Sequence, residues 1–305
     1  MVGFPRKLFL LVIFCASTAL LSACEEQDQS TQSPEFSDGP GNQEQIYVFG
    51  IHPLHNPERL HEIFGPLMRH LEAKIPEAKF RLEASRNYAA YDEKLYSGKF
   101  HFSLPNPFQT INSLKHGYRV FGKMGDDHNF RGIILVRKDS GIEKVEDLKG
   151  KPVSFPAPSA LAATMMPQFY LQTNGLDVMK DLDIRYVGSQ ESSIMNVFLG
   201  DTVAGATWPP PWRLLAAERP QLSEELEIKW QTDPLPNNGL VARGDVASDL
   251  VDEVAAVLFG LHEHEAGRAL LHRMDLSRFE RADNDTFQSV VDFVEVFAET
   301  VRPVD

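Results

Sequence analysis

The 305-residue sequence contains only two cysteines, Cys15 and Cys24, both within its first 24 residues. The rest of the chain therefore has no thiol for a disulfide, a thiolate nucleophile or a cysteine-containing zinc site. Basic residues are also scarce, because 30 Lys and Arg stand against 43 Asp and Glu, for a formal net charge of -13. That balance argues against nucleic-acid binding, which depends on basic surfaces that neutralise phosphates. It does not exclude a small anion bound at a local site.

Catalytic and cofactor motifs are missing as well. No serine lies in a nucleophile elbow, no glycine-rich stretch matches a nucleotide fingerprint, and no two carboxylates are spaced as a general acid and base. The stretch LHEHE (261–265) differs from the HExxH zinc motif. We therefore expect neither an enzyme nor a protein that depends on a metal or cofactor.

Long apolar runs are confined to the beginning of the chain. Residues 1–23 combine a basic start, an apolar stretch from Leu8 to Leu21 and small residues, which predicts an export signal. No later segment reaches the roughly 18 consecutive apolar residues that a membrane-spanning helix requires. The polar, acidic residues 24–44 predict a flexible tether.

The end of the signal predicts a lipid anchor. Leu21-Ser22-Ala23-Cys24 resembles the lipobox of bacterial lipoproteins, in which the cysteine is lipidated and becomes the mature N-terminus. We expect a periplasmic protein anchored to a bacterial membrane through Cys24. The alternative is an ordinary signal cleaved elsewhere, with Cys24 as an unpaired thiol.

From residue 45 onward, short apolar strands alternate with amphipathic helices, a pattern that predicts largely parallel sheets covered by helices. The expected order is strand 46–51, helix 58–75, strand 80–85, helix 88–97, strand 100–104, strand 131–140, a short helix and strand in 145–155, helix 160–173, strand 184–188, a helix ending near Gly200, a strand in 203–208, a return path at 234–243 and two C-terminal helices. The fold class is therefore α/β, with two lobes and a ligand cleft between them. Lobe 1 comprises residues 45–137 plus 238–305, lobe 2 comprises 138–237, and two hinge crossings join them.

Several stretches of the chain carry a family resemblance. They are Tyr88 at a helix start, DLKGKPVSF (147–155), the loop and helix with Pro158 and Pro167, VGSQESSIMNVFLG (187–200) and WQTDPLPNNGLVAR (230–243). In these stretches the sequence resembles the periplasmic substrate-binding proteins of ABC importers for phosphate, phosphite and phosphonate. The resemblance implies the type II periplasmic-binding-protein fold, capture of a small ligand by hinge closure, and delivery to an ABC permease.

The resemblance also locates an anion site and shows how this chain departs from it. In the family, a run of Ser and Thr after the DLKGK strand holds phosphoryl oxygens at a helix N-terminus, but here the run reads Ala160-Leu161-Ala162-Ala163. Gln190 stands where the family often has a histidine, and Asn237 and Asn238 stand where an acidic residue pairs with an aminoalkyl group. Each lost hydrogen bond is worth about 0.5–3 kcal/mol. We therefore expect an altered site that holds an anionic ligand, or one with a flat or apolar body, mainly by main-chain amides and aromatic walls.

The candidate ligand-binding residues come from both lobes and the second crossing. They are His52, Tyr88, Asn106, Ser159, Ala160, Leu161, Ala162, Ala163, Gln190, Trp208, Asn237 and Asn238. Each has a structural alternative: close packing of helix on sheet for the alanines, core aromatics for Tyr88 and Trp208, a turn for Asn106 and a solvated loop for His52.

Two other functions share the same fold. One is a sensor whose closure is read by a membrane receptor or histidine kinase instead of a permease. The other is an enzyme similar to those that make a thiamine-pyrimidine precursor, which needs reactive His and Cys residues in the cleft. The absence of cysteine after position 24 makes the enzyme the weakest of these hypotheses.

Overall fold

The computed structural model describes residues 45–304. The predicted export signal, the lipidation site at Cys24 and the tether lie outside these residues. Within the described part, no helix combines the length and apolar character that crossing a bilayer demands.

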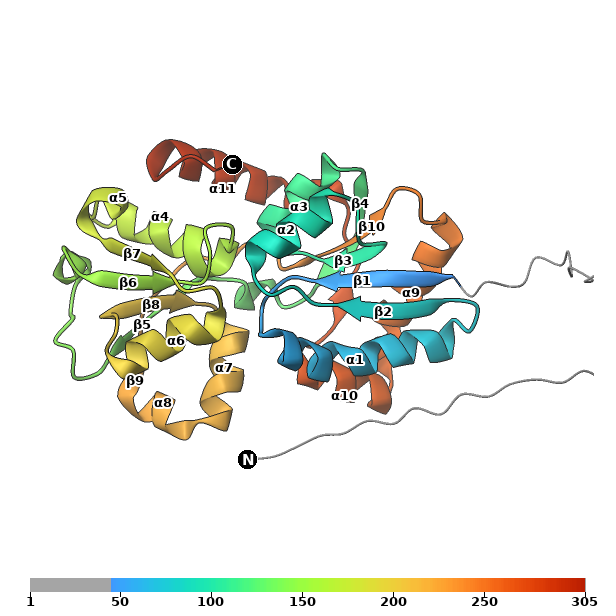
Figure 1. The fold of residues 1–305 in the computed structure, drawn as a ribbon, viewed down its shortest axis with the longest axis horizontal. Coiled ribbons are helices and arrows are strands. Elements are labelled where there is room, and N and C mark those ends of the chain that lie inside the picture. The colour runs from blue at the N-terminus through green and yellow to red at the C-terminus, as the bar shows by residue number, and fades with distance from the viewer. Residues whose placement is uncertain (1–44, 305) are drawn as a thin grey trace, which may run out of the picture. The chain divides into compact units, whose positions relative to one another are not determined.

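The first lobe is built on a six-stranded sheet in the order β11-β4-β10-β3-β1-β2. Its strands are β1 Ile46–Ile51, β2 Lys79–Glu83, β3 Phe102–Leu104, β4 Tyr118–Met124, β10 Gly239–Arg243 and β11 Phe279–Glu280. The helices of this lobe are α1 Pro57–Lys74, α2 Tyr88–Tyr96, α3 Pro107–Leu114, α9 Ser248–Gly260 and α10 Glu265–Arg273. Figure 1 shows them on both faces of the sheet.

The second lobe is built on a five-stranded sheet in the order β7-β6-β8-β5-β9. Its strands are β5 Ile133–Arg137, β6 Pro152–Phe155, β7 Asp183–Tyr186, β8 Ala204–Thr207 and β9 Leu226–Gln231. The helices here are α4 Met166–Thr173, α5 Val178–Asp181, α6 Gln190–Leu199, α7 Pro209–Glu218 and α8 Pro220–Glu225. The expected two-lobed α/β architecture is confirmed (Figure 1).

Two details of the sequence prediction were wrong. The sheets are mixed and not largely parallel, because β10 pairs antiparallel with β3 and β4, and β5 pairs antiparallel with β8 and β9. Residues 133–137 were assigned to lobe 1, whereas β5 lies inside the sheet of lobe 2. The apolar run IILV in β5 is compatible with the interior of either sheet, so its pairing partner could not be read from the local pattern.

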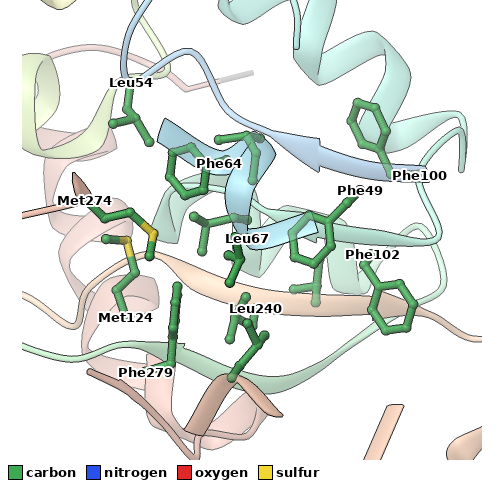
Figure 2. Packing of buried hydrophobic residues seen from close by; sticks show 14 of the residues in the cluster. Phe49, Leu54, Phe64, Leu67, Phe100, Phe102, Met124, Leu240, Met274 and Phe279 are labelled. Atoms are coloured by element: carbon green, nitrogen blue, oxygen red, sulfur yellow. The ribbon is translucent and has the colours of Figure 1, made fainter. Parts of the chain in front are cut away.

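The core of the first lobe depends on the amphipathic face of α1. Asn56 caps this helix by accepting from the amide of Arg59 at 2.9 Å, and Pro57 occupies its first turn. The buried face of α1 consists of Leu60, Ile63, Phe64, Leu67, Met68 and Leu71. Figure 2 shows Phe64 and Leu67 in one cluster with Phe49 of β1 and Leu240 of β10. The return strand β10 therefore helps to complete the first lobe.

The two segments that join the lobes run side by side. The first crossing (125–132) follows β4 and the second crossing (232–238) precedes β10. Main-chain hydrogen bonds connect them from the amide of Leu235 to the carbonyl of Phe130 at 3.0 Å and from the amide of Thr232 to that of Gly132 at 2.9 Å. Helix α11 Gln288–Thr300 contacts both α3 and α4, so the C-terminal helix also bridges the lobes (Figure 1).

Gly132 of the first crossing is tightly packed against residues of the second lobe, so a larger side chain at this position should be destabilising. A Cβ at this position would lie 2.6 Å from the carbonyl oxygen of Ala162 and 2.6 Å from Cγ of Pro167. We expect Gly132→Ala to lower the free energy of unfolding by about 1–3 kcal/mol in chemical denaturation. The matched control is Gly65→Ala in α1, whose new Cβ meets only Arg69 Nη1 at 3.6 Å, and alanine should stabilise that helix by up to about 1 kcal/mol. Equal stabilities for the two variants would contradict this description of the hinge.

Candidate functional site

A small cavity lies between the lobes and is lined from both of them. Its wall consists of His52, Tyr88, Asn106, Phe130, Ala160, Leu161, Ala162, Ala163, Gln190 and Trp208. All of these except Phe130 are residues that the sequence singled out. The cavity volume is about 10 Å³, which leaves space for about one water molecule. The structure is therefore a closed form.

The helix entrance that the sequence predicted forms one wall of the cavity. Leu161–Met165 make a π-helical turn that leads into α4, and no side chain caps this turn at Ala160. The first amide N–H groups of a helix have no intrahelical acceptor, so those at the beginning of this turn are available to a ligand. Ala160 and Ala163 also pack against Tyr88 of the other lobe. The small side chains thus line the cavity and at the same time allow the lobes to approach closely.

Tyr88 and Gln190 connect the lobes across the cavity. Gln190 Nε2 donates to the Tyr88 hydroxyl at 3.2 Å, and Gln190 Oε1 accepts from Thr207 Oγ1 at 2.8 Å. Burial raises the pKa of the Tyr88 phenol above its ordinary value, so the hydroxyl keeps its proton. Because that hydroxyl already accepts from Gln190, its own proton is the part that can be offered to a ligand.

His52 contributes a neutral ring to the cavity. Burial lowers the pKa of His52 to about 4, despite the hydrogen bond between its Nδ1 and the carbonyl of Leu104 at 2.9 Å. A carbonyl can only accept, so Nδ1 carries the hydrogen and Nε2 remains an acceptor. His55 nearby is also neutral, because burial and Arg59 lower its pKa to about 3. No lysine or arginine is among the residues that line the cavity.

Asn106 and Ser159 hold the lobes together beside the cavity. Asn106 caps α3 in a capping box with Gln109, and its Nδ2 donates to the carbonyl of Ser159 at 3.0 Å. Ser159 Oγ donates to Asp92 Oδ2 at 3.0 Å, so this hydroxyl is used between the lobes and Ser159 does not line the cavity. Sequence reasoning missed Asp92, although Tyr88 four residues earlier in α2 places it on the same helix face.

Asn237 and Asn238, two of the candidate ligand-binding residues, are not among the residues that line this cavity. Asn237 Nδ2 donates to the carbonyl of Gly125 at 2.7 Å, and its main-chain amide donates to Asp127 at 2.9 Å. The amide of Met124 donates to the carbonyl of Asn238 at 2.8 Å. Both asparagines are buried at the end of the second crossing, where they fasten it to the first.

Aromatic and charged contacts complete the site. Trp208, at the start of α7, packs against Phe130 of the first crossing with their ring centroids 5.5 Å apart. At the rim, Arg59 of α1 pairs with Glu191 at 3.3 Å and also with Glu218.

Among residues 45–304, no cluster of His, Cys, Asp and Glu side chains could hold a metal ion.

Comparison with known proteins gives a consistent result. A family model described as "ABC transporter, phosphonate, periplasmic substrate-binding protein" matches residues 49–287. The probable ABC transporter phosphite binding protein PhnD1 of Prochlorococcus marinus is 23% identical over 195 residues, which are 60% of this chain and 64% of that protein. The chain therefore spans slightly less than two thirds of the length of this relative.

Two solved structures share the fold. A binding protein component of an ABC phosphonate transporter from Pseudomonas aeruginosa superposes with a TM-score of 0.77 at 16% identity, covering 84% of this chain and 87% of the other. PhnD1 of Prochlorococcus marinus in complex with methylphosphonate superposes with a TM-score of 0.76 at 17% identity, covering 84% of this chain and 99% of the other.

The buried Tyr88–Gln190–Thr207 contact predicts a measurable effect on stability. We expect Gln190→Leu to lower the free energy of unfolding by about 1–3 kcal/mol, because both hydroxyl groups lose a buried partner. Urea denaturation measures this loss. Gln288→Leu is the control, since Gln288 is exposed on α11, and it should change stability by less than about 0.5 kcal/mol. A loss no larger than that of the control would contradict the assignment.

Proposed function

Because this chain belongs to the family of periplasmic substrate-binding proteins of phosphonate-type ABC transporters, we propose that it captures a small ligand between its lobes and delivers it to an ABC permease. Members of this family bind substrates for transport and are not enzymes. The observation that carries the proposal is the cavity, which takes its wall from both lobes at an uncapped helix entrance. A ligand that contacts both lobes favours the closed form over the open one.

The ligand we propose is a phosphonate-like oxyanion with an apolar substituent. Main-chain amides at residues 161–163 and the Tyr88 hydroxyl supply donors for the oxyanion, and His52 Nε2 supplies an acceptor for a protonated ligand oxygen. Without a cationic side chain in the wall, this site binds the charge of the oxyanion more weakly than one lined by arginine or lysine. The alanines, Phe130 and Trp208 form the apolar part.

The closed form also indicates what must move when a ligand binds. A methylphosphonate has five heavy atoms, whereas the cavity holds about 10 Å³. The ligand therefore enters an open form, and the lobes of the filled form lie farther apart than those described here. The Tyr88–Gln190 hydrogen bond is the contact we expect the ligand to replace, because it crosses the cavity and joins two groups of its wall.

The lipid anchor completes the proposed function. Lipidation of Cys24 and the acidic tether would hold the binding domain in the periplasm near the membrane and leave it free to reorient. Mass spectrometry of the exported protein should find a lipid-modified N-terminal Cys24. An exported protein that begins elsewhere with no added lipid would refute the anchor and leave the binding function unaffected.

A ligand screen tests the proposed function directly. Thermal shift and calorimetry should be carried out with phosphate, phosphite, methylphosphonate and phenylphosphonate, with small uncharged heterocycles in parallel. We expect affinity to rise with the apolar substituent, and a ligand at 100 times its Kd should stabilise the fold by about 2.7 kcal/mol. Stronger binding of phosphate or phosphite than of either organic phosphonate would overturn the proposed ligand class, and so would binding of the heterocycles alone.

Restoring a hydroxyl at the helix entrance should strengthen anion binding. Ala162→Ser adds one donor to the cavity wall, and a hydrogen bond to a charged group is worth about 1.5–3 kcal/mol, so we expect the Kd for methylphosphonate to fall at least tenfold in calorimetry. Ala217→Ser, on the exposed side of α7, is the matched control and should leave the Kd unchanged. An unchanged Kd for Ala162→Ser would show that the entrance does not hold the anion.

A further inference from the structure

Four residues beside the cavity form a closed ring of hydrogen bonds that includes both lobes. Asp92, Asn106 and Gln109 belong to the first lobe, and Ser159 belongs to the second. Gln109 Nε2 donates to Asp92 Oδ1 at 2.6 Å, Asn106 Nδ2 donates to the carbonyl of Ser159 at 3.0 Å, and Ser159 Oγ donates to Asp92 Oδ2 at 3.0 Å. We call these four residues the interlobe ring.

The orientation of each amide in the ring is fixed by the capping box of α3. Asn106 Oδ1 accepts from the amide of Gln109 at 3.1 Å, which leaves Nδ2 to point to Ser159. Gln109 Oε1 accepts from the amide of Asn106 at 3.0 Å, which leaves Nε2 to point to Asp92. Each group of the ring that can donate is therefore matched to a group that can accept, and Asp92 is the one charged member.

The two bonds to Ser159 exist only when the lobes are together, whereas those to Gln109 lie within the first lobe. We propose that Asp92 is a positioning residue that sets the equilibrium between open and closed forms through its bond to Ser159, without lining the ligand cavity. The inference deepens the proposed function, because closure around a ligand starts from this equilibrium. Asp92 is half-buried in the closed form, so opening and closing also change its exposure to water.

Protonation of Asp92 should also make the equilibrium between the open and closed forms depend on pH. Burial raises the pKa of Asp92 from 3.8 to about 6, although the bonds from Gln109 and Ser159 lower it. If opening returns the pKa toward 3.8, the closed form binds the proton more tightly. Closure is then favoured most at low pH, and this advantage is lost as the pH rises through about 6. The same two pKa values give a closed-to-open ratio up to about tenfold higher at pH 5 than at pH 7.

The other groups around Asp92 do not titrate in this pH range. Tyr88, Tyr91 and Tyr96 of its own helix have phenol pKa values raised above the ordinary value by burial. Helix α3 presents the neutral Gln109, and the loop of the second lobe presents the neutral Ser159. The guanidinium of Arg302 reaches this loop, where it donates to the carbonyl of Pro158 at 2.8 Å.

The experiment measures the distance between the lobes in the full chain without ligand. Spin labels are attached to cysteines introduced at Glu62 of α1 and Glu224 of α8, both exposed, with Cys15 and Cys24 replaced by serine. At pH 5, where Asp92 is mostly protonated in the closed form, we expect Ser159→Ala and Asp92→Ala each to lower the closed-to-open ratio about tenfold. The double variant should show little further loss, because both substitutions remove the same bond. Asp92→Asn should stay closed and lose the pH dependence, since an amide can still donate to Ser159 and accept from Gln109.

The control is Ser97→Ala, because Ser97 Oγ donates to the carbonyl of Lys94 within the first lobe; it should leave the distances unchanged. If every protein stays closed, the series is repeated with Arg59→Ala, which removes the rim ion pairs and weakens closure. In the Arg59→Ala protein, adding Ser159→Ala or Asp92→Ala should lengthen the distance between the spin labels. Unchanged distances would overturn the proposal, even if the melting temperatures of these variants fall. Because no ligand is used, failure of the ligand screen does not affect this test.

Discussion

The rest of the site depends on one contact between the lobes. The helix entrance at residues 160–163 lies close to Tyr88 of the first lobe. Ala157, Ala160 and Ala163 form one buried cluster with that tyrosine of the opposite lobe. Larger side chains would hold the lobes apart, and Gln190 would no longer reach the Tyr88 hydroxyl, now 3.2 Å from its Nε2. We propose that these small side chains also take the place of hydroxyl groups that would donate to an anion. Closure and ligand choice would then both depend on this one short segment.

The hinge and the interface contribute differently to closure. The two crossings are joined by hydrogen bonds, and Asn237 fastens them at the end near the first lobe, so movement there is restricted to bending and twisting of a paired ribbon. The interface combines apolar packing of the helix entrance around Tyr88 with separate polar contacts. The polar contacts are the interlobe ring, the Tyr88–Gln190 bond and the ion pairs of Arg59. Each is worth about 1–3 kcal/mol or less. A small ligand can therefore shift the balance between the two forms.

Sequence reasoning succeeded where local pattern determines structure. The amphipathic face of α1 and the βαβ alternation identified the two-lobed fold. Most of the candidate ligand-binding residues lie together in the wall of one cavity. Sequence reasoning was wrong where long-range pairing decides the outcome, as in the assignment of β5 to the first lobe. Asn237 and Asn238 satisfy hinge backbone groups that lie more than a hundred residues earlier in the chain. Asp92 was missed because its importance depends on Ser159, 67 residues away, and no local pattern reveals that pair.

We propose that main-chain amides of the uncapped helix entrance hold the ligand. The most direct measurement is a titration of the 15N-labelled protein with methylphosphonate, followed by the amide resonances of Leu161, Ala162 and Ala163. We predict large downfield proton shifts at these amides, as for N–H groups that donate to an oxyanion, together with smaller changes along both crossings. Saturable binding that leaves these three resonances in place and moves those of another surface would show that the ligand binds elsewhere.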